Sequence, residues 1–172
     1  ATLLATSLGT VAALGLSRRN MPFKGTIMAI LISPMIVPLI ITSAGMFFFY
    51  SKIGLTHTYL GLILAHTALG TPFVVITVTA TLTGFDTNLI RASQSLGADT
   101  MQTFFKVIMP LILPGVISGG LFAFITSFDE VVVVMFVGSV EQITIPKQMW
   151  AGLRQETSPV ILCMATCLVA LS

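Results

Sequence analysis

Two adjacent carboxylates, Asp129 and Glu130, interrupt a long apolar stretch and are the side chains with the clearest chemical potential. Residues 107–128 before them and 131–138 after them carry no charge. A carboxylate inside a membrane costs about 2.5–3.5 kcal/mol on insertion scales, so it is expected to face a watery path or a charged partner. The pattern predicts a pathway for a positively charged solute. The alternative is that the apolar helix ends earlier and both acids lie at the membrane interface.

Other reactive side chains indicate packing rather than catalysis. His66 lies in an apolar segment with no acid within two turns, so we expect a hydrogen-bonded packing residue rather than a proton relay. Cys163 and Cys167 are expected to be free, buried thiols. The sequence has no nucleotide-binding glycine loop, nucleophile elbow or spaced set of metal ligands. We therefore expect no catalytic residue, no metal site and no cofactor bound by this chain.

The composition indicates a membrane protein. Charged residues make up 8% of the 172, whereas a soluble domain carries about 25%. Residues 25–51, 53–85 and 107–128 are free of charge, and each stretch exceeds the ~20 residues that cross a bilayer. The net charge of +2 is too small to indicate a nucleic-acid partner.

The apolar segments predict an all-α, polytopic transmembrane bundle. Complete spans are expected at 25–50, kinked by its prolines, at 59–83 and at 110–137. The apolar runs 1–16 and 159–172 are too short to cross. We therefore expect a single transmembrane domain over residues 1–172, truncated at both ends, with about five of about six spans.

The polar stretch at 84–109 lies between two of these spans. Lys and Arg are more frequent in this stretch and in the loop around Arg18 than in the alternate loops, which places both in the cytoplasm. Two short helical patterns flank Gly97, and Asp99 is spaced to cap the second one. Pro110 is expected to end that helix. The amphipathic pattern is typical either of a helix pair on lipid headgroups or of a docking site for a soluble partner.

A second polar stretch, 138–158, is expected on the opposite side of the membrane. Pro146 suits a first helical turn, and Met149, Trp150 and Leu153 share a helical face. Trp150 is a candidate to cap the solute pathway or to contact a partner protein. A plain interfacial helix is an equally good interpretation.

The residues around Gly97 resemble the EAA motif of ABC-importer permeases, in which Glu-Ala-Ala is followed by a glycine and an apolar-x-Pro end. The chain also resembles the spermidine/putrescine-type permeases through residues 127–133, SFDEVVV, and 145–154, IPKQMWAGLR. Arg91 stands where the motif usually has Glu, so an acid-mediated contact at that position is not expected. Ala92, Gly97 and Pro110 match the motif. The residues that the resemblance assigns to ATPase coupling are Arg91, Ala92, Ser93, Gly97, Ala98, Phe104, Phe105 and Pro110.

The resemblance implies a type I ABC-importer permease whose coupling-helix loop, residues 84–110, sits in a cleft of a cytoplasmic ATPase dimer. It implies a second permease subunit, an extracytoplasmic solute-binding protein and the inner membrane of a bacterium. ATP and magnesium would be bound by the ATPase, and the solute would be a polyamine that passes Asp129, Glu130 and Trp150. The alternatives are a permease for another small solute and an ion-coupled secondary transporter.

Overall fold

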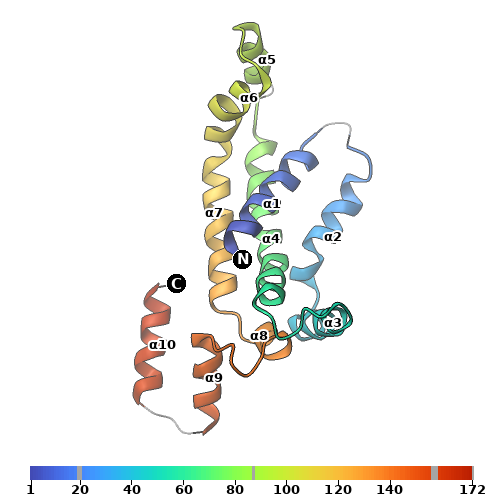
Figure 1. Cartoon of the computed structure of the whole chain (residues 1–172). Helices are drawn as coiled ribbons and strands as arrows, with labels where there is room; N and C mark the ends of the chain where they lie inside the picture. The colour runs from blue at the N-terminus through green and yellow to red at the C-terminus, as the bar shows by residue number, and fades with distance from the viewer. Residues whose placement is uncertain (19–20, 87, 156–158, 172) are drawn as a thin grey trace.

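The structure is a computed structural model that describes residues 1–18, 21–86, 88–155 and 159–171, and this part of the chain is helical without a β-strand (Figure 1). The predicted all-α class is confirmed. The helices are α1 (Thr2–Leu16), α2 (Lys24–Ile36), α3 (Leu39–Ile53), α4 (Tyr59–Thr83), α5 (Asn88–Ser95), α6 (Thr100–Thr103), the π-turn Phe104–Ile108, α7 (Met109–Phe128), α8 (Val132–Val137), α9 (Ile145–Gln155) and α10 (Pro159–Leu171).

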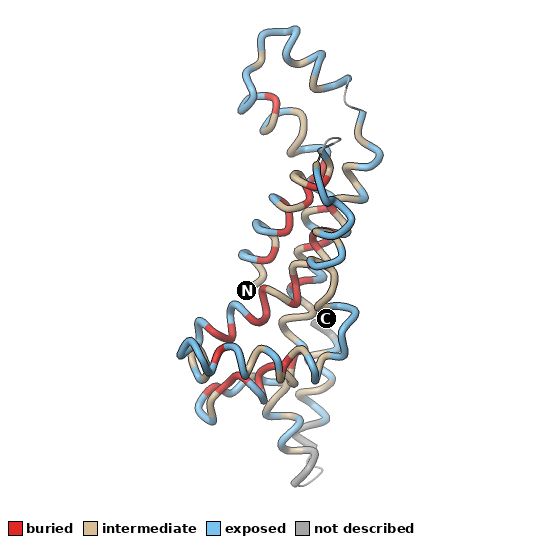
Figure 2. Tube along the Cα trace, turned by 90° about the vertical axis from the view of Figure 1, so that its right-hand side faces the viewer, coloured by how far each residue is buried: buried red, intermediate tan, exposed pale blue. Residues whose placement is uncertain are grey.

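The core of the bundle is formed by α1, α4 and α7, which pack through small residues. Figure 2 shows how the buried residues are distributed along the chain. Gly119 lies so close to α4 that a Cβ would be 2.7 Å from the Cα of Val74. Gly115 lies against Thr81, and Gly9 of α1 lies against Val74 from the other side. Glycines at these positions let the helix backbones approach, which is how membrane helices gain van der Waals contact.

The α4 span agrees with the predicted limits, but the limits predicted for the following span, 110–137, are wrong. One helix of 29 residues runs from Thr100 to Phe128 and joins α6, the π-turn and α7. Pro110 does not end the preceding helix. It lies in the first turn of α7, directly after the π-turn, in which the Met109 N–H donates to the Phe104 carbonyl. The wider hydrogen-bonding pattern of a π-turn accommodates the proline within a continuous helix.

The segment predicted as one kinked span, 25–50, is broken into α2 and α3, which meet at 106°. Val37 is extended, and Pro38 has no N–H to continue the helical bonds of α2. In consequence α3 lies across the direction of α4 and packs against α8 (Figure 1). These helices form a second core with the first half of α4, made of Tyr50, Leu62, Ala65, Leu69, Val133, Val134 and Val137.

Within the described residues, two helices are long and apolar enough to cross a membrane, or three if the bent α2–α3 pair counts as one span. The five spans that we predicted included the two short terminal segments, which form α1 and α10. The prediction that Cys163 and Cys167 are buried is wrong, because both are exposed on α10. An exposed thiol on an apolar helix is compatible with contact to lipid or to another membrane subunit.

Candidate functional site

Two candidate regions lie at opposite ends of the 29-residue helix (Figure 1). The first, called the elbow, comprises residues 84–110 with α5 and α6. The second, called the acid end, comprises residues 126–144, where α7 ends and α8 begins. A straight helix of this length spans roughly 43 Å at 1.5 Å per residue, so the two regions have no direct contact through their own side chains.

The elbow turns at Gly97, which adopts φ +84°, a left-handed conformation that favours glycine. The Gly97 N–H donates to the Gln94 carbonyl at 3.0 Å, and the Ala98 N–H donates to the Ser93 carbonyl at 3.1 Å. This pair of bonds is the Schellman arrangement that ends a helix at a glycine. The glycine turn predicted from the sequence is therefore confirmed, together with the reason for it.

The second arm of the elbow begins at Asp99, whose Oδ1 accepts a hydrogen bond from the Gln102 N–H at 2.6 Å. This is the predicted helix cap. The hydroxyls of Ser93 and Thr103 lie 2.9 Å apart and join the two arms. The short arms are thus held at a defined angle by a capped start, a glycine turn and a cross-link.

The structure divides the predicted coupling residues between two faces of the elbow. The exposed ones are Arg91, Ala92, Gly97, Phe105 and Pro110, whereas Ser93, Ala98 and Phe104 are half-buried. The outer face also presents Leu96, which is 89% exposed, and Met101, which is 66% exposed. An exposed apolar surface on a connecting segment of this kind marks a contact with a partner or with lipid.

At the acid end, α7 stops at Phe128, so the alternative of an early helix end is the one that the structure supports. Asp129 is the exposed C-terminal cap of α7. Glu130 is 7% exposed, and its Oε1 accepts a hydrogen bond from the Val133 N–H at 2.9 Å. Glu130 therefore caps the start of α8, and its side chain is buried within the bundle.

A cavity of about 330 Å³ lies beside Glu130. Its wall includes Thr126 of α7, Phe73 of α4 and residues 34–39 at the α2–α3 bend. The carbonyls at the end of α2 belong to the negative end of a helix dipole. Pro38 offers no N–H to the Pro34 carbonyl. The cavity is thus mainly apolar, with Glu130 as the one charged residue among the described residues that line it and the end of α2 beside it, and this charge favours a positively charged group.

A neighbouring cavity of about 350 Å³ brings together polar groups that lie far apart in the sequence, namely Tyr59, His66, Ser127 and Glu141. The Nδ1 of His66 lies 2.9 Å from the Ser127 Oγ, and His66 is buried, so the predicted hydrogen bonding of this side chain is confirmed. Sequence reasoning missed Glu141 as a pathway candidate. No local spacing signals it, because 75 positions separate it from His66.

The loop that carries Glu141 is fastened to the turn before α4. His57 donates from its backbone N–H to the Val137 carbonyl at 2.8 Å, and its Nδ1 lies 3.0 Å from the Gly138 carbonyl, which can only accept. Gln142 Nε2 donates to the His57 carbonyl at 3.4 Å. Lys147 Nζ donates to the Ser139 carbonyl at 2.8 Å. These contacts give the acid end a rigid outer loop.

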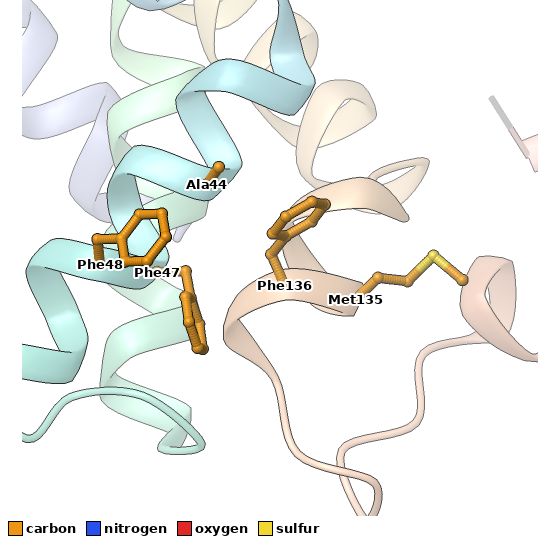
Figure 3. A pocket seen from close by; sticks show the side chains of 5 residues that line it. All are labelled: Ala44, Phe47, Phe48, Met135 and Phe136. Carbon is orange, nitrogen blue, oxygen red and sulfur yellow. The ribbon is translucent and has the colours of Figure 1, made fainter.

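Trp150 lies on α9, the helix expected after Pro146, and 46% of its surface is exposed. It does not line the two cavities described above. A third cavity at this end, about 360 Å³, lies between α3 and α8 and is lined by Ala44, Phe47, Phe48, Met135 and Phe136 (Figure 3). Its aromatic and thioether walls fit an apolar occupant rather than a charged one.

Comparisons with known proteins agree with the resemblance. The model of a family described as "Binding-protein-dependent transport system inner membrane component" matches residues 5–172. The chain is 31% identical over 169 residues to the spermidine/putrescine transport system permease protein PotC of Haemophilus influenzae and 30% identical over 168 residues to PotC of Escherichia coli. These alignments cover 98% of this chain and 66% and 64% of the two relatives.

A further relative is the putrescine transport system permease protein PotI of Escherichia coli, which is 30% identical over 169 residues. That alignment covers 92% of this chain and 59% of the relative. The chain therefore spans less than two thirds of the length of each of these relatives. All three relatives carry a polyamine in their names.

Proposed function

Because this chain belongs to the family of binding-protein-dependent transport system inner membrane components, we propose that the whole protein is the membrane permease subunit of an ATP-driven importer. Its partners would be a cytoplasmic ATPase dimer, a second permease subunit and an extracytoplasmic solute-binding protein. The ATPase would bind ATP and magnesium, and this chain would bind no cofactor and perform no bond chemistry. The protein would lie in the inner membrane of a bacterium.

The observation that carries the proposal is the geometry of the elbow. Its exposed face is rigid, and its second arm continues without interruption through α7 to the acid end. A push by an ATPase on this face would move α7 as a lever, as rigid-body switching between two states requires. We assign Arg91, Ala92, Gly97, Phe105 and Pro110 to the contact surface, and Ser93, Ala98 and Phe104 to its support.

We further propose that the solute is a polyamine. The names of the relatives support this, and so does the placement of Glu130 and Glu141 on two cavities at the acid end. Attraction between unit charges about 4 Å apart is about 4 kcal/mol at an effective dielectric of 20, enough to offset part of the lost hydration of an ammonium group. Asp129 and Trp150 belong to the outer approach to this pathway rather than to its buried part.

The test is uptake by proteoliposomes that contain the full-length permease with its ATPase, second permease subunit and binding protein. We expect uptake of labelled spermidine that requires ATP inside the vesicles and persists when ion gradients are collapsed. Uptake driven by a proton or sodium gradient without ATP would instead indicate the secondary transporter. ATP-dependent uptake of a different small solute would keep the importer and reject the polyamine.

A further inference from the structure

A cavity of about 510 Å³ lies beneath the elbow and is larger than the three cavities described at the acid end. Three parts of the fold enclose it: the end of α1, the end of α4 and the inner face of the elbow. The lining residues are Leu14, Ser17, Arg18, Leu82, Phe85, Ile90, Gln94, Thr100, Thr103, Phe104 and Ile108. Of the predicted coupling residues only Phe104, which we assigned to the support of the contact surface, lines this cavity, so the cavity is distinct from the proposed contact surface itself.

The cavity is amphiphilic. Leu14, Leu82, Phe85, Phe104 and Ile108 make its apolar part. The hydroxyls of Ser17 and Thr103 are already hydrogen-bonded, to the Ala13 carbonyl and to Ser93. The remaining polar groups are the Arg18 guanidinium, the Gln94 amide and the Thr100 hydroxyl, all of which can donate. No carboxylate occurs among the described residues that line it, so its charge complement is an anion.

The position of the cavity relative to the ends of the apolar helices indicates which kind of anion it would bind. The apolar helices α1 and α4 end at Leu16 and Thr83, and Arg18 and Phe85 follow within two residues. The place where apolar helices end is the level of the lipid headgroups. The distribution of Lys and Arg assigns this end to the cytoplasmic leaflet, which carries anionic lipids, and basic pockets between membrane helices on that side bind their headgroups.

We propose that this cavity binds one anionic phospholipid of the cytoplasmic leaflet. The phosphate contacts Arg18, with Gln94 and Thr100 as further donors, and an acyl chain lies against Phe85 and Phe104. Because Phe104 and Ile108 delimit the π-turn, the lipid supports the helix where its hydrogen bonding is widest. It also links α1 to the elbow, so its loss would weaken the support of the coupling surface.

The experiment uses the full-length permease assembled with its partner subunits in nanodiscs of phosphatidylcholine doped with phosphatidylglycerol. After partial delipidation, native mass spectrometry counts the phosphatidylglycerol molecules retained. We expect one retained lipid in the wild type, a several-fold lower retention in Arg18→Gln, and wild-type retention in Lys24→Gln. Lys24 is the matched control because it is an exposed basic residue of the same membrane end that does not line the cavity.

Two further measurements distinguish a bound lipid from a soluble phosphate compound and from a segment of the ATPase. sn-Glycerol 3-phosphate should not displace the retained lipid, and a benzophenone side chain at Gln94 should be photo-crosslinked to phosphatidylglycerol. Equal retention in Arg18→Gln and Lys24→Gln would overturn the proposal. So would displacement by the soluble headgroup, or a crosslink formed with an ATPase peptide instead of lipid. Lipid retention is measured without any transport assay. A failure of the lipid-binding proposal is therefore distinguishable from a failure of the proposed importer function.

Discussion

The elbow and the acid end differ in the charge of their cavities and in the way their residues are assembled. The elbow cavity is lined by the Arg18 guanidinium, whereas two of the three acid-end cavities described above are lined by a carboxylate, Glu130 in one and Glu141 in the other. The predicted coupling residues all belong to one stretch of 20 positions, 91–110. The acid end draws on the α2–α3 bend, α4, α7 and the loop before α9.

The way the two regions are assembled predicts how each responds to substitutions in distant parts of the chain. The elbow is shaped by hydrogen bonds between residues a few positions apart, such as the Gly97 turn and the Asp99 cap. Its geometry should survive distant substitutions. The acid end depends on contacts such as His66 with Ser127 and His57 with Gly138, which require the whole bundle to be packed. It should respond to any change that separates the helices.

The largest expected effect concerns the sidedness of the two regions. Leu96 of the elbow is 89% exposed and Val140 of the acid end is 91% exposed, so they form a matched pair for cysteine labelling. In a full-length protein without other cysteines, Val140→Cys should react with an impermeant maleimide in intact cells. Leu96→Cys should react only after permeabilisation. Labelling of position 96 from outside would reverse the orientation and remove the docking argument.

The second prediction tests whether the elbow works as a rigid lever. At φ +84°, a β-branched side chain is strained by about 1–2 kcal/mol, whereas Asn tolerates the left-handed region. Gly97→Val should abolish substrate-stimulated ATP hydrolysis by the assembled complex, and Gly97→Asn should keep most of it. Gly84→Val is the control, because a Cβ there meets nothing closer than the Thr81 carbonyl oxygen at 4.0 Å. Equal activity of Gly97→Val and Gly84→Val would contradict the lever.

The third prediction separates the two acids. Glu130→Gln removes the buried charge but keeps an oxygen that can accept the Val133 N–H, so α8 stays capped. We expect spermidine uptake to fall at least several-fold at unchanged expression. Asp129→Asn is the exposed neighbour and should have the smaller effect. An equal loss in both variants would show that burial beside the cavity does not distinguish the two carboxylates.

The fourth prediction concerns the packing that connects the two regions. Gly119→Ala places a Cβ 2.7 Å from the Val74 Cα and should destabilise the bundle by about 1–3 kcal/mol, as overpacking does. The midpoint of thermal unfolding in detergent should fall. Gly45→Ala on α3 is the control, because a Cβ there meets nothing within 4 Å. An unchanged unfolding midpoint in Gly119→Ala would show that α4 and α7 can move apart to accommodate the added methyl group at no cost in stability.

The smallest expected effect is the loss of the elbow cap. Asp99→Ala removes the acceptor for the Gln102 N–H and should cost about 1 kcal/mol of local helix stability. Hydrogen exchange should accelerate in residues 100–103 while the amides of α4 keep their protection. Asp99→Asn keeps a capping oxygen and should behave like the wild type. Faster exchange throughout α4 would mean that the elbow is not a local unit.

Sequence reasoning placed the elbow well because its determinants are local. The composition set the all-α membrane class, the charge-free run gave the limits of α4, and Gly97 and Asp99 specified a turn and a cap within a few positions of each other. A glycine turn and an N-cap act through bonds of a few residues, so one sequence suffices to predict them.

The course of the backbone at the prolines required the tertiary structure. A proline removes one N–H whether the chain then bends or continues. At Pro38 the chain turns by 106° and α3 packs against α8, whereas at Pro110 the helix continues because the π-turn accommodates the ring. The predicted continuity of the span at 25–50 and the predicted start of the span at 110–137 were wrong for this reason.

The placement of the side chains that we propose for the pathway was also decided by packing alone. Asp129 and Glu130 are adjacent and chemically alike, yet one is exposed and the other is buried against the α2–α3 bend. Glu141 faces the cavity of His66 only because the loop of Ser139 and Gln142 is fastened to His57. Burial and long-range neighbours are properties of the assembled bundle. The sequence could therefore single out Asp129 and Glu130 as unusual charges in an apolar stretch, while only the fold decided which of them is buried and brought Glu141 to a neighbouring cavity.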